Sequence, residues 1–91
     1  MCTKKENAKF NDFRFVLGYK LRLIRECKGY THEEMAKKLG VSPATVQQYE
    51  SGKETANLLY VLGAAKIGRV TVEDLAYMSK VEFMVKLTSV N

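Results

Sequence analysis

The sequence predicts an all-α fold, a small bundle of short helices in a single domain. The first observation behind this prediction is the stretch HEEMAKKLGVSPATVQQYES at residues 32–51, where the start and stop signals of two successive helices follow one another closely. The second is the spacing of apolar side chains by three and four residues, which is typical of helices with one buried face. The third is size, because 91 residues of which 46% are hydrophobic suit one domain with its own core.

The first predicted helix begins near Asn11 or Asp12 and ends at Lys28, with Gly29 as its stop. Residues 1–10 are polar and contain lysines without a helical period, so we expect them to form a flexible N-terminal tail. The helix should turn one apolar stripe toward the core, made of Phe13, Val16, Leu17, Leu21 and Ile24.

Two helices joined by a very short turn come next. Thr31 precedes the first of them and Glu34 stands three residues later, which is the spacing of a capping box. Gly40 follows as the residue at positive φ that ends this helix. Ser42 is then a second N-cap, and Pro43 takes the first helical position, where its missing N–H costs nothing. Since the turn is so brief, the two helices must cross steeply, and the second one projects from the surface.

A fourth and a fifth helix complete the predicted bundle. The fourth begins after the N-cap candidate Asn57 and is expected to face the core with Leu58, Val61, Leu62 and Ala65. Thr71 and Asp74 bracket the start of a short fifth helix, whose inward residues are Val72 and Leu75. We expect the helical domain to span residues 11–79.

Residues 80–91 form a C-terminal extension with a different period. Apolar and other residues alternate there, which favours a half-buried β-strand that pairs with a second subunit. The helical alternative places Val81, Met84, Val85 and Thr88 on one face. The alternation makes the strand our preferred prediction.

From about Leu17 to Leu75 the sequence resembles the lambda-repressor-like (Xre/Cro) helix-turn-helix family. Ala36 matches the small residue where the two helices touch, Val46 matches the buried β-branched position, and YESGK at 49–53 matches the loop that closes the recognition helix. The resemblance implies a compact five-helix DNA-binding domain. The expected function is therefore sequence-specific binding of double-stranded DNA as a small dimeric transcriptional regulator, acting as a repressor.

The resemblance also implies which residues of helix 43–51 lie at the bases in the major groove. They are Pro43, Ala44, Thr45, Gln47 and Gln48. The amide of Gln48 can donate and accept together, which suits adenine, whereas Pro43 and Ala44 can offer only apolar contact to a thymine methyl. Because this helix contains no lysine or arginine, guanine recognition by arginine is excluded and an A/T-leaning half-site is expected.

Phosphate contacts should come from residues around that helix. The formal charge of +5 and the sequence pI of about 9.3 fit a polyanionic partner. The family commonly has a glutamine at the position of His32, which reaches the DNA backbone, although an exposed first-turn residue is an equal alternative. The expected phosphate-contacting residues are His32, Lys53, Lys20, Lys37 and Lys38. Glu50 is expected to bond within the protein, to a basic residue of the first helix.

Several apolar residues occupy positions where the family is usually polar, and a monomer seldom leaves such surface bare. We expect a homodimer on an inverted-repeat operator, with the C-terminal extension in the interface. The predicted partner surface comprises Phe15, Tyr19, Leu23, Leu59, Tyr60, Val81, Phe83, Val85 and Leu87. The alternative function is an antitoxin-like module that binds a toxin-type protein partner and also represses its own promoter.

Other functional classes lack support in the sequence. Two cysteines and one histidine fall short of a zinc site, and we expect no metal and no cofactor. No nucleophile–base set or glycine-rich phosphate loop is present, so an enzyme is not expected. No apolar run is long enough to cross a membrane and the N-terminus does not resemble a signal peptide, which makes the cytoplasm the expected location.

Overall fold

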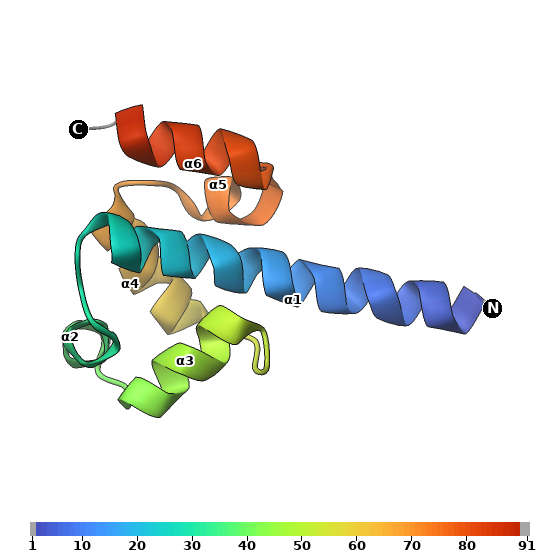
Figure 1. Cartoon of the computed structure of the whole chain (residues 1–91), viewed down its shortest axis with the longest axis horizontal. Helices are drawn as coiled ribbons and strands as arrows, with labels where there is room; N and C mark the ends of the chain where they lie inside the picture. Colours follow the sequence, from blue (N-terminus) through green and yellow to red (C-terminus); the bar gives the residue numbers. More distant parts are fainter. Residues whose placement is uncertain (1, 90–91) are drawn as a thin grey trace.

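The computed structural model describes residues 2–89, with side chains described for residues 13–88, and the regular secondary structure in this part of the chain is all helical. Figure 1 shows a long central helix with shorter helices packed around one half of it. The six helices are α1 (Cys2–Cys27), α2 (His32–Leu39), α3 (Pro43–Ser51), α4 (Leu58–Gly68), α5 (Val72–Tyr77) and α6 (Lys80–Ser89). The prediction of an all-α fold is confirmed, but the helix count of five is not.

Helix α1 begins at Cys2, so the prediction of a start near Asn11 or Asp12 was wrong. The residues between 2 and 11 include neither proline nor glycine, so nothing in them stops a helix from continuing toward the N-terminus. The N-terminal part of α1 extends beyond the rest of the molecule (Figure 1). Phe13 was predicted to face the core but is 52% exposed, because it lies in the part of α1 that few other helices cover.

Helix α1 separates α3 on one side from α6 on the other (Figure 1). Gly18 lies against α3 so closely that an added Cβ would be only 2.5 Å from the Tyr49 carbonyl oxygen and 2.6 Å from that of Glu50. Lys20, two residues on and therefore on nearly the opposite face of α1, lies over the ring of Phe83 in α6. The absence of a side chain at residue 18 thus permits the close crossing of α1 and α3.

The predicted helix-turn-helix is confirmed in its local geometry. Thr31 and Glu34 form the capping box, with the Thr31 N–H donating to Glu34 Oε1 at 2.8 Å and the Glu34 N–H donating to Thr31 Oγ1 at 3.1 Å. Gly40 ends α2 at φ 71°, in the left-handed region. Ser42 caps α3 by accepting from the Thr45 N–H at 3.2 Å. These contacts set the start of α3 relative to α2.

Helix α4 is rotated relative to the prediction. Val61 and Ala65 are buried as expected, but Leu58 and Leu62, predicted to face inward, are exposed. Tyr60, predicted to lie on the partner surface, is instead 2% exposed and packs edge-on against Tyr49, with ring centroids 4.8 Å apart. The large aromatic ring fills the space beneath α3, and its burial determines which face of α4 turns inward.

The predicted C-terminal strand is wrong, since α6 is a helix. Its N-terminus carries a capping box of its own, in which the Ser79 N–H donates to Glu82 Oε1 at 3.1 Å and the Glu82 N–H donates to Ser79 Oγ at 3.2 Å. Phe83 and Leu87, one helical turn apart, are buried in the core, whereas Val81 and Val85 are exposed. Residues 80–89 therefore belong to the packed domain, and the expectation that Phe83 and Leu87 contact a partner is wrong.

Candidate nucleic-acid interface

The outer face of α3 presents the residues that the sequence analysis assigned to base contacts. Pro43, Ala44 and Gln47 are exposed, and Thr45 and Gln48 are half-buried. Among the described residues, neither glutamine side chain has a hydrogen-bond partner, so both amides are available to a ligand. Thr45 differs, because its Oγ1 lies 2.9 Å from Ser42 Oγ and its hydroxyl is partly used in the N-cap.

Glu50 fixes the inner face of α3 to both α1 and α2. Its side chain is buried, and Arg25 Nε of α1 donates to Glu50 Oε2 at 2.8 Å. His32 Nε2 at the start of α2 lies 3.3 Å from the other carboxylate oxygen, Oε1. The prediction that Glu50 bonds to a basic residue of the first helix is confirmed. One carboxylate thereby ties α3 to the two helices beside it.

A small pocket of ≈ 260 Å³, which we name the basic pocket, lies where these three helices meet. It is lined by Arg22, Arg25, His32, Gln47, Glu50 and Ser51. Arg25 also donates from Nη1 to the Tyr30 carbonyl at 2.9 Å, and Arg22 Nε pairs with Glu26 at 2.9 Å. These pairings hold both guanidinium groups in place next to Gln47, where an anion could bind between them.

Arg22 and Arg25 were missing from the residues predicted to contact phosphate. Their signal in the sequence is their three-residue spacing, which places them on one face of α1. That spacing becomes informative only once the packing of α1 against α3 is known. His32, which was predicted, lies in the basic pocket, but its imidazole already contacts Glu50.

Of the four lysines predicted to contact phosphate, Lys20 is buried and cannot reach DNA, so this prediction was wrong. Its side chain is buried, and Nζ donates to the carbonyl oxygens of Leu75 at 2.8 Å and Asp74 at 3.4 Å. Burial lowers the pKa of the Lys20 ammonium, while the nearby Asp74 carboxylate raises it. The Met78 N–H already donates to the Asp74 carbonyl, and the shorter Lys20 bond goes to the Leu75 carbonyl, so Lys20 adds a donor to the last turn of α5. The prediction failed because a lysine on a basic helix was taken to face solvent.

The remaining three lysines are exposed. Lys37 and Lys38 lie in the last turn of α2, where Lys38 Nζ is 5.0 Å from the centroid of the Tyr30 ring. Lys53 follows Gly52, the residue that ends α3. All three surround the helix-turn-helix, and their ammonium groups are open to an approaching polyanion.

The predicted partner surface does not form one patch. Phe15 and Leu59 are exposed on α1 and α4, and Val81 and Val85 are exposed on α6. Tyr19 and Leu23 are half-buried, and Lys80 Nζ lies 5.3 Å from the centroid of the Tyr19 ring. Tyr60, Phe83 and Leu87 are in the core, and the residues that remain exposed are divided among α1, α4 and α6.

None of the helices in the described part of the chain has the length and apolar character needed to span a membrane.

Residues 21–75 match the family described as Helix-turn-helix. An uncharacterized HTH-type transcriptional regulator of Bacillus subtilis, YazB, is 31% identical over 61 residues, covering 67% of this chain and 88% of that protein. Another of Methanocaldococcus jannaschii, MJ0272, is 39% identical over 56 residues, covering 62% of this chain and 85% of that protein. The match spans the Thr31–Glu34 capping box, the turn glycine Gly40 and the outward face of α3, and the chain accordingly belongs to the lambda-repressor-like helix-turn-helix family.

Proposed function

We propose that this protein binds double-stranded DNA in a sequence-specific manner, with α3 in the major groove, and acts as a small homodimeric repressor of transcription. The observation that carries the proposal is the outward face of α3, where two glutamine amides have no hydrogen-bond partner among the described residues and one of them, Gln47, lines the basic pocket. Amides that can donate and accept together suit base edges, and fixed cations beside them suit the phosphate backbone. The two similar proteins, both named as HTH-type transcriptional regulators, support the same function.

Base recognition is assigned mainly to Gln48. Its amide can bond to N7 and N6 of adenine together, and no arginine on α3 competes for guanine. Pro43 and Ala44 are exposed at the start of α3 and offer apolar surface to a thymine methyl. Thr45 stands near them with its hydroxyl directed to the cap. An A/T-leaning half-site follows from these side chains.

Phosphate binding is assigned to two groups of residues around α3. The first is the basic pocket, with Arg22, Arg25 and Gln47, together with the N-terminus of α2, whose free N–H groups favour an anion. The second is three exposed lysines, Lys37 and Lys38 in the last turn of α2 and Lys53 just after the end of α3. His32 is assigned a smaller part in phosphate binding. Its imidazole contacts Glu50, and the part of the side chain that stays exposed can meet the DNA backbone.

The homodimer is proposed because a single module of this size buries only about 600–1,000 Å² on DNA, and two-fold pairing doubles that contact. Two-fold symmetry in turn calls for an inverted-repeat operator, with half-sites about 34–36 Å apart if the helices enter successive turns of the major groove. A regulator of this kind must be in the same compartment as its operator DNA, and we propose the cytoplasm as the location of this protein.

A second function, an antitoxin-like module that also represses its own promoter, is favoured by one observation. Leu58, Leu59 and Leu62 are all exposed on α4, and none of them is among the residues assigned to DNA. Three exposed leucines on one short helix suit a hydrophobic protein partner, such as a toxin. Co-purification of a stoichiometric partner that Leu59→Glu abolishes would support this function over the simple repressor.

The proposed function is tested by selecting bound sequences from a random duplex DNA library with the full-length protein. Enrichment of an inverted repeat with A/T-leaning half-sites is the expected result. The same selection with a variant that carries Gln47→Ala and Gln48→Ala is the control, and it should lose the enriched motif. Recovery of no motif with the unaltered protein would overturn the proposal.

A further inference from the structure

Helix α4 turns a row of apolar side chains outward. Leu58, Leu59 and Leu62 are 68%, 79% and 46% exposed. Gly63 follows four residues after Leu59, and Lys66 follows four residues after Leu62, so both continue the same face of the helix toward its C-terminus. A contiguous apolar surface of this kind marks a contact site on a small protein.

A pocket lies at the C-terminal part of this face, where α2 meets α4. Its volume is ≈ 430 Å³, and it is lined by Lys38 and Leu39 of α2 and by Gly63, Lys66 and Ile67 of α4. An added Cβ at Gly63 would be only 2.5 Å from Leu39 Cδ2, so the missing side chain allows α2 to approach α4 here. Both lysines are exposed, whereas Leu39 and Ile67 are half-buried. The pocket therefore has an apolar floor and a cationic edge.

The charges on this surface, which we name the α2–α4 surface, have one sign. Helix α4 contains no acidic residue, and the two glutamates of α2 lie in its first turn, at the end opposite to Lys37 and Lys38. The Lys66 side chain has no hydrogen-bond or ion-pair partner among the described residues. Exposed leucines are poor partners for phosphate, so DNA does not account for this surface. An occupant that complements it must combine carboxylates with apolar side chains.

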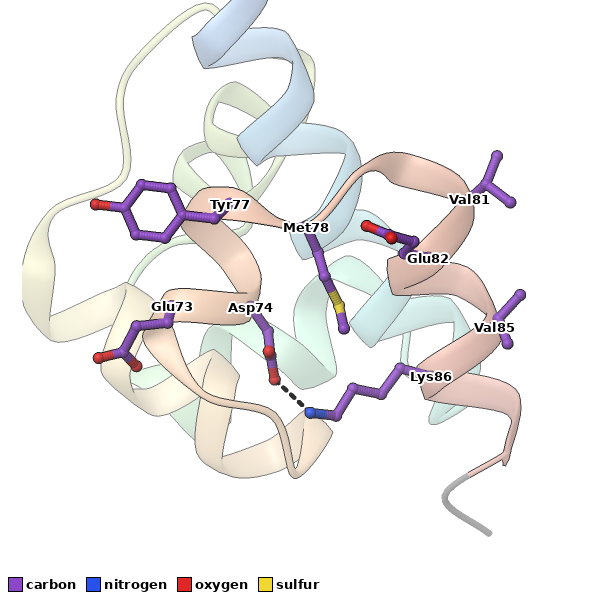
Figure 2. Close-up of a pocket in the computed structure, with 8 residues that line it drawn as sticks. All are labelled: Glu73, Asp74, Tyr77, Met78, Val81, Glu82, Val85 and Lys86. Carbon is purple, nitrogen blue, oxygen red and sulfur yellow. Dashed lines mark hydrogen bonds and ion pairs between the residues drawn. The ribbon is translucent and has the colours of Figure 1, made fainter.

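The groove between α5 and α6 has the opposite charge (Figure 2). It is lined by the carboxylates of Glu73 and Glu82, and the lysine on its wall is already paired, with Lys86 Nζ 2.7 Å from Asp74 Oδ2. Tyr77 is 85% exposed on the same groove. An acidic occupant would be repelled there, and the groove therefore supplies a matched control for the α2–α4 surface.

We propose that the α2–α4 surface binds an acidic amphipathic helix of a partner protein, with an apolar side chain of that helix in the pocket and its carboxylates opposite Lys38 and Lys66. The leucine row runs along α4, and a helix whose apolar residues are spaced by three and four can pack along such a row. The pocket is concave and suits a protruding side chain, whereas a bilayer offers a flat surface. The inference adds a protein-binding activity to the proposed DNA binding and does not depend on it, and it names the surface that the antitoxin-like function would use.

Selection from a displayed library of random helical peptides, with the full-length protein as the target, tests this surface. The enriched peptides should carry aspartate or glutamate beside apolar residues spaced by three and four. A synthetic peptide of the enriched sequence, labelled for fluorescence anisotropy, should bind Leu59→Glu and Lys66→Glu at least about tenfold more weakly than the unaltered protein. The matched controls are Tyr77→Glu in the α5–α6 groove and Lys28→Glu, an exposed lysine at the end of α1, and both should bind the peptide normally.

Circular dichroism and thermal unfolding should be unchanged in all four variants, and Leu59→Gln replaces Leu59→Glu if the latter is unstable. Charge exchange supplies a second measurement. The peptide with lysines in place of its carboxylates should bind Lys66→Glu at least about tenfold more tightly than it binds the unaltered protein, which a loss of folding could not produce.

Enrichment of no acidic amphipathic peptide, or equal losses in Leu59→Glu and Tyr77→Glu, would overturn the proposal. Binding to vesicles of phosphatidylglycerol and phosphatidylcholine that Leu59→Glu abolishes, without any enriched peptide, would also overturn it and indicate a lipid surface as the partner. Leu59→Glu should still bind the selected DNA. Absence of DNA binding in the unaltered protein would count against DNA recognition and leave the peptide result standing.

Discussion

Helices α3 and α6 pack against opposite sides of α1, but different forces hold them there. The α3 side has a direct backbone approach at Gly18 and a buried carboxylate, Glu50, bonded to Arg25. The α6 side has the apolar side chains of Phe83 and Leu87, with Lys20 buried beside them. Directional bonds fix an angle, whereas apolar burial mainly supplies stability.

This difference suits what each side is proposed to do. A helix that reads base edges must be held at one orientation, because base contacts depend on hydrogen-bond geometry. Helix α6 has no such requirement, and its outer face can remain apolar and available for a partner. The comparison therefore predicts that changes on the α6 side mainly lower stability, whereas changes on the α3 side also alter DNA recognition.

The largest expected effect is on the α6 side. Phe83→Ala should lower the free energy of unfolding by about 3–5 kcal/mol, because it removes a fully buried ring and leaves a cavity. Val85→Ala on the exposed face should cost less than about 1 kcal/mol. Urea unfolding followed by circular dichroism measures both. Similar small losses for the two variants would mean that α6 is not part of the core.

On the α3 side, Glu50→Gln should lower the free energy of unfolding by about 1.5–3 kcal/mol, since the charge-assisted hydrogen bond from Arg25 is weakened and the contact with His32 is altered. It should also reduce the preference for the selected site over random DNA, because α3 loses its anchor. Glu54→Gln, exposed just beyond α3, is the control and should change neither quantity. A stability loss without any change in DNA preference would contradict the orienting role of Glu50.

A smaller effect concerns pH. The Lys86 ammonium, followed by the Thr71 N–H, lowers the pKa of Asp74 from its ordinary value of 3.8. The pKa of Asp74 is lower in the folded protein than in the unfolded chain. The Lys86–Asp74 ion pair therefore contributes fully to the free energy of unfolding above the ordinary pKa of Asp74, and this contribution is lost as pH falls through the folded pKa. Lys86→Met should therefore cost about 0.5–1 kcal/mol at pH 7 and progressively less below about pH 4. A difference that stays constant down to pH 2 would show that the ion pair does not contribute.

The smallest effect is expected at Tyr60. Its hydroxyl is buried and has no hydrogen-bond partner among the described residues, and burial raises the pKa of this hydroxyl far above its ordinary value. Tyr60→Phe removes a polar group without removing the ring that packs on Tyr49, so stability should change by less than about 0.5 kcal/mol or rise slightly. Thermal unfolding measures the change. A loss above about 1 kcal/mol would indicate that the hydroxyl does have a partner.

The helix-turn-helix could be predicted in detail because its geometry depends on local chemistry. Thr31 with Glu34, Gly40, and Ser42 each act on backbone groups within four residues, so the sequence alone identifies them. The C-terminal helix was mispredicted because residues spaced by four, such as Phe83 and Leu87, share a face in a strand as well as in a helix. The Ser79–Glu82 capping box was the local signal that favoured a helix.

The remaining misses concern contacts between distant parts of the chain. The positions of Lys20 and Tyr60 depend on which surfaces α5 and α3 present to them, and no local pattern records that. Arg22 and Arg25 are plainly basic in the sequence, but their place in the basic pocket follows from how α1 packs on α3. Capping and turn residues near in sequence thus define where the helices begin and end. Packing between distant helices decides which side chains stay exposed and can bind a ligand.

The central claim, that α3 reads DNA bases, is tested most directly by comparing Gln48→Ala with Lys53→Ala in binding measurements on the selected site and on random duplex DNA over a range of salt concentrations. Gln48→Ala should lose about 1–3 kcal/mol of binding free energy on the selected site and little on random DNA. Lys53→Ala should weaken binding to both and lower the salt slope by about one unit, because one phosphate contact releases about one counterion. Equal losses of Gln48→Ala on the two DNAs would contradict the claim.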